Sequence, residues 1–296
     1  MNTLSDFEIK QRKYMPVFPK ATGKPTPYIE GYPYEDDEPM AATGFHAEQI
    51  VTLADQFFRY FEINEHIFVG IDTFIYYREG DHRKVVAPDI YIVLGASKFP
   101  QRRSFYTWSE GAAPSVVFEF LSDSTAHQDR DEKVPLYLVD IGVQEYFIHQ
   151  PDMERTAELR GWRRGSSGDI VEIAPDAEGG LFSETLNLYF RWKEDPVTEV
   201  RLLRPYLPDG TPITTSREDQ ALKEKALEQR QIAEEQRQAA EEQRQAAEEQ
   251  RQAAEEQRQA AEEQRQAAER RVREEQERRQ AAEAELARLR AQLAHR

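Results

Sequence analysis

The chain has no cysteine among its 296 residues, and this absence excludes disulfide bridges and cysteine-bound zinc. It also has no apolar run that approaches the roughly 18 residues of a membrane-spanning helix. The first ten residues, MNTLSDFEIK, lack the apolar core of a signal peptide. We therefore expect a cytoplasmic protein that makes no membrane contact.

Aromatic residues are scarce in residues 217–296, so this part cannot build a core of its own. In residues 1–216 acidic residues outnumber basic ones. The net charge is −16, and because residues 217–296 carry 17 basic and 20 acidic side chains, the remaining −13 lies in residues 1–216. An acidic body repels nucleic acid at long range, which argues against a general nucleic-acid coat and requires local basic patches for any such contact.

Proline and polar residues divide the chain. Residues 1–40 contain six prolines and are predicted to form an extended, partly disordered arm. Residues 41–204 hold the apolar and aromatic runs of a folded domain, residues 205–216 are interpreted as a proline-rich linker, and residues 217–296 as a long charged helix.

The folded part alternates helical and strand-like patterns. Thr43 is placed to cap a helix over 43–61 with one apolar face. Strand-like runs rich in β-branched and aromatic residues follow at 66–77, 85–94, 115–121 and 145–149. A short helix separates the last two runs. This order predicts an α/β domain with a mixed sheet flanked by helices.

Two acids stand inside these apolar runs. Asp89 shares a strand face with Tyr91 and Val93, and Glu119 shares one with Val117 and Leu121. A buried carboxylate costs several kcal/mol unless it is paired or binds a metal. On neighbouring strands about 4.8 Å apart, both carboxylates could hold one Mg²⁺ or Mn²⁺, with Lys133 on the next helix to stabilise the charge of a phosphate.

Each of these assignments has a plainer alternative. Asp89 could cap a turn, and Lys133 could pair with Asp129 one helical turn away. Glu48 and Asp72 are further candidate acids, although a solvated helix face suits Glu48 better.

The loop between the two acidic strands offers Lys98, Arg102 and Arg103 as phosphate contacts, with ordinary solubilising charges as the alternative. His46 is interpreted as a capping or core histidine and not as a metal ligand.

The order of the motifs resembles a known family. P-D at 88–89, E-x-x-S-x-S-T at 119–125, D-x-x-x-K-x-x-x-Y at 129–137 and G-V-x-E-Y-F at 142–147 are similar to the Uma-two family of the PD-(D/E)XK nuclease superfamily. The resemblance covers about residues 30–200. It implies a restriction-endonuclease-like fold and a metal-dependent phosphodiesterase with Asp89 and Glu119 as metal ligands.

The lysine departs from the superfamily pattern. Leu121 stands where the superfamily has its lysine, and members of this branch take the lysine from the next helix, which corresponds to Lys133. Pro135 follows two residues later and is tolerated only in the first turn of a helix. We therefore expect a helix that begins near Asp131, or a kink.

The C-terminal part repeats A-E-E-Q-R-Q-A five times over residues 233–267. These residues form helices readily, and the seven-residue period predicts a continuous, coiled-coil-like helix. Its apolar positions are alanines, which bury little area, while larger apolar residues occur at both ends of the helix. We expect a homo-oligomer formed through this helix, with a solitary charged helix as the alternative.

Two functional hypotheses follow. The first is a Mg²⁺-dependent endonuclease that hydrolyses DNA, with Asp89, Glu119 and Lys133 as its catalytic residues. The second is a catalytically inactive nuclease fold that recruits partners through the helical tail.

Overall fold

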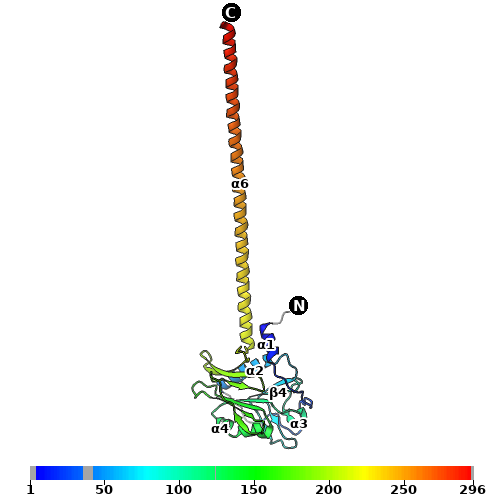
Figure 1. The fold of residues 1–296 in the computed structure, drawn as a ribbon. Coiled ribbons are helices and arrows are strands. Elements are labelled where there is room, and N and C mark those ends of the chain that lie inside the picture. The colour runs from blue at the N-terminus through cyan, green and yellow to red at the C-terminus, as the bar shows by residue number, and fades with distance from the viewer. Residues whose placement is uncertain (1–4, 36–42, 124, 295–296) are drawn as a thin grey trace. The chain divides into compact units, whose positions relative to one another are not determined.

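The computed structural model describes residues 5–35, 43–123 and 125–294. The chain divides into two units, Met1–Ala221 and Leu222–Arg296. Figure 1 shows the elements in chain order. No helix in the described ranges is both long enough and apolar enough to cross a membrane.

A six-stranded mixed sheet forms the centre of the first unit. Its spatial order is β1 (Ile67–Ile71), β4 (Ile90–Leu94), β6 (Val116–Phe120), β7 (Glu145–His149), β8 (Leu159–Arg164) and β9 (Ile170–Glu172). Strands β6 and β7 run parallel, and the other neighbours in this sheet run antiparallel. The α/β class with a mixed sheet is confirmed.

Two three-stranded sheets accompany the central sheet. One has the order β3 (Val85–Val86), β2 (Ile75–Tyr76) and β5 (Phe105–Tyr106), followed directly by the short helix α3 (Thr107–Glu110). The other has the order β10 (Leu181–Ser183), β11 (Leu188–Asp195) and β12 (Val200–Tyr206). The runs predicted at 66–77 and 85–94 are thus each divided between two strands.

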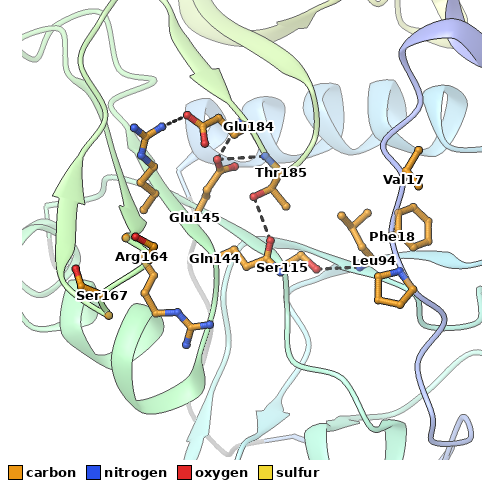
Figure 2. A pocket seen from close by; sticks show the side chains of 15 residues that line it. Val17, Phe18, Leu94, Ser115, Gln144, Glu145, Arg164, Ser167, Glu184 and Thr185 are labelled. Atoms are coloured by element: carbon orange, nitrogen blue, oxygen red, sulfur yellow. Dashed lines mark hydrogen bonds and ion pairs between the residues drawn. The ribbon is translucent and has the colours of Figure 1, made fainter.

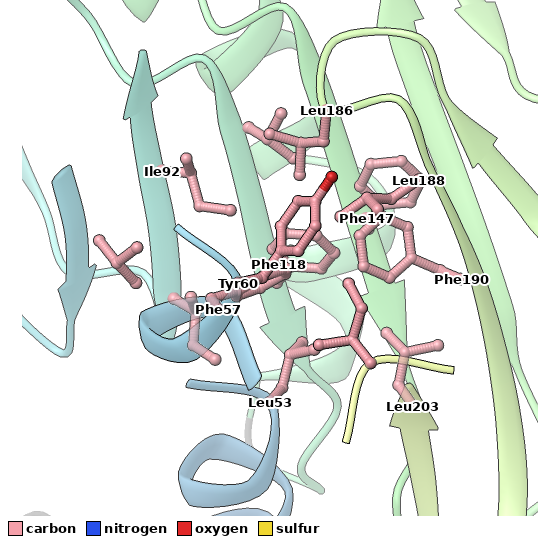
Figure 3. Close-up of a cluster of buried hydrophobic side chains, with 14 of the residues drawn as sticks. Leu53, Phe57, Tyr60, Ile92, Phe118, Phe147, Leu186, Leu188, Phe190 and Leu203 are labelled. Carbon is pink, nitrogen blue, oxygen red and sulfur yellow. The ribbon is translucent and has the colours of Figure 1, made fainter. Parts of the chain in front are cut away.

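Helix α2 (Gly44–Tyr60) covers one face of the central sheet. Its first turn is capped because the Thr43 side chain accepts a hydrogen bond from the His46 amide, as the sequence predicts. The ring centroid of Phe57 lies 5.4 Å from that of Phe118 of β6 in a tilted arrangement, and the Phe118 ring stacks on Phe147 of β7 with their centroids 5.2 Å apart. Figure 3 shows these rings together with Phe190 of β11 in one buried cluster.

Three short helical segments lie over the opposite face: α4 (Ala126–Arg130), α5 (Lys133–Pro135) and the π-helical η1 (Leu136–Ile141). Their buried side chains pack against Tyr91, Val117 and Tyr146 of the sheet. The helical path is interrupted at Asp131, so that Pro135 falls in the first turn of a new segment, which confirms the expected break.

The two segments expected to be irregular are largely folded. Within residues 1–40, α1 (Asp6–Tyr14) begins with a capping box at Ser5, and the buried Gln11 side chain donates to the Arg59 carbonyl oxygen at 3.2 Å. Residues 1–4 and 36–40 of the predicted arm lie outside the described ranges.

The interpretation of residues 205–216 as a linker is wrong. They contain the end of β12 and the fully buried Leu207 and Ile213, which belong to the core beneath α2. Helix α6 (Ser216–Ala294) follows them. Its side chains from residue 220 to residue 290 are exposed. The apolar residues and not the prolines decide the structure of this segment, because two aliphatic side chains fill the core.

Candidate active site

The acid pair lies at one end of two neighbouring strands. Strands β4 and β6 are antiparallel with Ile90 opposite Phe118, and the same register continued by one residue places Asp89 opposite Glu119. The Cβ atoms of directly opposite residues in an antiparallel pair are about 4.5–5.5 Å apart. The structure therefore agrees with the strand parity argued from the sequence.

Two protein donors fix the Asp89 carboxylate. The Phe120 amide donates to Oδ2 at 2.6 Å, and His46 Nε2 lies 2.9 Å from Oδ1. Burial lowers the pKa of His46, but the hydrogen bond and charge of Asp89, with Glu119 and Asp129 beyond it, raise the pKa above its usual value overall. The prediction that His46 is only a capping or core residue is therefore incomplete, because its side chain belongs to the acid pair's surroundings.

Glu119 is 4 % exposed and is held from the helical side. Its Oε1 accepts hydrogen bonds from Lys133 Nζ at 2.8 Å and from the Tyr137 hydroxyl at 2.7 Å. The pKa of Glu119 is raised to about 8; burial is the largest cause, Lys133 opposes the rise, and the charges of Asp89 and Asp129 add to it. A further positive charge near this carboxylate, in addition to that of Lys133, would favour its ionised form.

Lys133 also contacts a third acid. Its Nζ lies 2.7 Å from Oδ1 of Asp129, one helical turn earlier and 1 % exposed. Burial lowers the pKa of Lys133, yet the two carboxylates raise it above its usual value overall, so that Lys133 is a protonated ammonium group. The sequence alternative of a surface lysine paired with Asp129 is thus half correct, because the pair exists but is buried against Glu119.

The two further candidate acids take no direct part in this arrangement. Asp72 is exposed and has a positive φ of 45°, and its amide donates to the backbone oxygen of Asp89 at 3.2 Å. Its placement as a buried acid is wrong, since the strand has already turned out of the sheet. Glu48 is exposed on α2, as expected for a solvated helix face.

The three candidate phosphate contacts differ from one another. Arg102 is buried and forms a bidentate ion pair with Glu110, at 2.6 and 2.9 Å, so its assignment as a phosphate contact is wrong. Lys98 Nζ donates to the Phe61 backbone oxygen at 3.1 Å near the end of α2. Arg103 is exposed and lies 4.7 Å from the ring centre of Tyr34.

The donor set fits a hydrated cation with two protein ligands. Within the described ranges no three acidic or histidine side chains converge as a metal site. Mg²⁺, however, is commonly held by one or two carboxylates, with water and substrate phosphate as its other ligands. Among the described residues, no hydrogen-bond donor contacts Oε2 of Glu119, so this oxygen is open to such a cation.

A separate cavity lies elsewhere in the described structure. It has a volume of about 970 Å³ and is lined by residues such as Leu94, Ser115, Gln144 and Arg164 (Figure 2). These residues stand at the opposite ends of β4, β6 and β7 from the acid pair. The cavity is therefore separate from the candidate active site.

Sequence reasoning underestimated His46 and Asp129 for different reasons. His46 precedes Asp89 by 43 residues, and its tertiary contact leaves no local pattern in the sequence. The spacing of Asp129 and Lys133 did indicate a pair, but the burial of that pair follows from how the helices cover the sheet.

The chain is similar in sequence and in structure to known proteins. The model of the Uma2 family, described as "Putative restriction endonuclease", matches residues 17–184. A solved structure, described as "a putative nuclease belonging to DUF820 from Anabaena variabilis ATCC 29413", has 17 % sequence identity and a TM-score of 0.36, and the match covers 51 % of this chain and 77 % of that one. No curated protein matches the chain.

Proposed function

Because the chain belongs to the Uma2 family, we propose that it is a metal-dependent endonuclease that hydrolyses phosphodiester bonds of DNA. One observation carries the proposal: the Lys133 ammonium group lies 2.8 Å from the buried Glu119. Glu119 stands opposite Asp89 on the neighbouring strand. A buried charge cluster of this kind is costly for stability, which indicates a functional reason for keeping it.

Asp89 and Glu119 are the residues that would hold Mg²⁺ or Mn²⁺. When bound there, the cation supplies Lewis-acid polarisation of the phosphate and a more acidic water molecule. His46 and the Phe120 amide fix the direction of the Asp89 oxygens. This hydrogen-bonded support keeps the carboxylate oriented without any movement during the reaction.

Lys133 would stabilise the negative charge that develops on the phosphate. Its ammonium group is fixed between two carboxylates and is 22 % exposed, so one side of it remains accessible from solvent. Preorganised charges of this kind lower an activation barrier because they need no rearrangement as the reaction proceeds.

A cleavage assay tests the proposal directly. Purified chain is incubated with single- and double-stranded DNA and with RNA, in Mg²⁺, Mn²⁺ or EDTA, beside Asp89→Asn. The matched control is Asp123→Asn, an exposed acid in the loop after β6. We expect metal-dependent DNA cleavage that Asp89→Asn removes and Asp123→Asn keeps. Equal cleavage by both variants would disprove the assigned site.

Self-association through α6 is a second part of the proposal. Large apolar side chains on this helix are exposed: Leu222, Leu227, Ile232, Val272, Leu286 and Leu289. Burying them against a second copy would stabilise an oligomer, since each fully buried leucine contributes about 1.5–3 kcal/mol. Light scattering after size-exclusion chromatography should give a multiple of 34.4 kDa, and a monomer at high micromolar concentration would exclude this assembly.

A further inference from the structure

Asp129 is a buried acid whose role the acid pair alone does not explain. It is 1 % exposed. Apart from an ion pair with Lys133, neither of its carboxylate oxygens has a partner among the described residues. Its charge is balanced by the ion pair with Lys133, and the Tyr146 hydroxyl fixes its backbone through a 3.0 Å bond to the carbonyl oxygen. An unpaired carboxylate at this depth would be strongly unfavourable, so Asp129 and Lys133 depend on each other.

Glu119 meets conflicting demands. Its Oε1 already accepts from Lys133 and Tyr137, while the proposed function also requires Glu119 to bind a cation. An ammonium group and a divalent cation repel each other and compete for the same carboxylate. A cation on the other oxygen, Oε2, would therefore weaken the attraction of Glu119 for Lys133, although Lys133 must remain in place for the phosphate.

We propose that Asp129 is a positioning residue that retains Lys133 when Glu119 turns to the cation. The inference rests on the proposed function, because it concerns the same cation site. The two contacts of Lys133 are of nearly equal length, 2.8 Å to Glu119 and 2.7 Å to Asp129, so the loss of one leaves a complete ion pair with the other. Asp129 thus separates the lysine from the cation without releasing it to solvent.

A double-mutant cycle on Mn²⁺ binding tests this role without measuring cleavage. The variants are Asp129→Asn, Lys133→Met and the two combined, with Mn²⁺ affinity measured by calorimetry. With Asp129 present, the lysine scarcely opposes the cation, so Lys133→Met should raise affinity by less than about threefold. In the Asp129→Asn background, Lys133 has only Glu119, and Lys133→Met should raise affinity about tenfold or more.

A larger gain in Mn²⁺ affinity from Lys133→Met in the wild-type background than in the Asp129→Asn background would overturn the inference. If Asp129 is itself a cation ligand, Lys133→Met helps most when Asp129 is present, and the larger gain appears in the wild-type background. If Asp129 only supports the fold, both gains are equal. Absence of Mn²⁺ binding by the wild-type chain overturns the inference together with the metal requirement. DNA cleavage with the wrong order of gains overturns the inference alone, and the correct order without cleavage overturns the nuclease proposal alone.

A measurement on the unmutated chain covers the case in which Asp129→Asn does not fold. The ammonium protons of Lys133 exchange slowly while they are bonded to buried carboxylates, and ¹⁵N-labelled lysine reports this exchange by NMR. Assignment comes from the signal that Lys133→Met removes. The signal should persist when Mg²⁺ is added, whereas rapid exchange after Mg²⁺ addition shows that the lysine leaves and contradicts its retention by Asp129.

Discussion

Two buried glutamates on neighbouring parallel strands have opposite kinds of surroundings. Glu119, near the end of β6, is held by the side chains of Lys133 and Tyr137, with other acids nearby. Glu145, at the start of β7, accepts from the amides of Glu184 and Thr185 at 2.8 and 3.3 Å and from a serine hydroxyl. Burial raises the pKa of both carboxyl groups.

The difference separates a structural acid from the proposed cation ligand. Backbone amides cannot leave Glu145 without breaking the turn between β10 and β11, so its hydrogen bonds belong to the fold. The donors around Glu119 are side chains on a helical segment, and a cation or substrate can replace them. Burial alone, which both residues share, therefore does not identify the site.

The same substitution at both positions tests this contrast and should give the largest effect. Glu119→Ala should lower the cleavage rate at least about 100-fold, because it removes the proposed cation ligand. Glu145→Ala should leave the cleavage rate per folded molecule unchanged but lower the free energy of unfolding by about 1–3 kcal/mol, because the buried Ser183 hydroxyl and two partly buried amides lose their acceptor. Urea denaturation and initial cleavage rates measure the two quantities.

Glu119→Ala should destabilise the fold less than Glu145→Ala, since Lys133 keeps Asp129 as its partner. The contrast fails if Glu145→Ala impairs cleavage as strongly as Glu119→Ala does.

Much of the site could be predicted because its determinants are local. The apolar runs around Asp89 and Glu119 define strands, and a period of two decides which face each acid takes. The spacing of four between Asp129 and Lys133 predicts their contact even across the helix break. Pro135 predicted that break correctly, because its ring excludes a helical interior.

The remaining features depend on tertiary contacts. Arg102 and Glu110 lie in a loop and a short helix, and nothing in their spacing separates a buried ion pair from two solvated charges. Leu207 and Ile213 are the apolar residues of a proline-rich stretch, and their burial follows from the way β12 meets α2. Sequence patterns report periodicity along one element and not the partner that the element meets.

A buried histidine sharpens the comparison through pH. His149 at the end of β7 is fully buried, with its ring nitrogens 3.1 and 2.7 Å from the backbone oxygens of Glu158 and Arg201. Burial lowers the pKa of His149 to about 4, although both hydrogen bonds raise it. Like Glu145, it is a titratable group held by backbone, and we expect it to contribute to stability and not to catalysis.

The sign of the pH effect follows from this lowered pKa. As pH falls below 6.5, the unfolded chain binds a proton at His149 before the folded chain does. The contribution of His149 is therefore complete above pH 6.5 and should decrease by about 3 kcal/mol towards pH 4. Urea denaturation of wild type and His149→Gln at both pH values measures the difference. His127→Gln, at an exposed histidine, serves as the control and should behave as wild type. An equal loss in all three chains would refute the assignment.

The smallest expected effect concerns two basic residues that contact neither Glu119 nor Glu145. Arg103 is exposed beside Tyr34 and remains a candidate phosphate contact, whereas Lys98 holds backbone oxygens near the end of α2. Arg103→Ala should weaken binding of a single-stranded oligonucleotide a few-fold and lower the salt dependence by about one charge, with the free energy of unfolding unchanged. Lys98→Met should lower the free energy of unfolding, because it removes a contact at the end of a helix. It should leave the binding of the oligonucleotide unchanged, because the binding surface is intact. Fluorescence anisotropy across a salt series measures the first effect. Unchanged affinity and salt slope in Arg103→Ala would show that this arginine, like Glu145, belongs to the fold and not to the site.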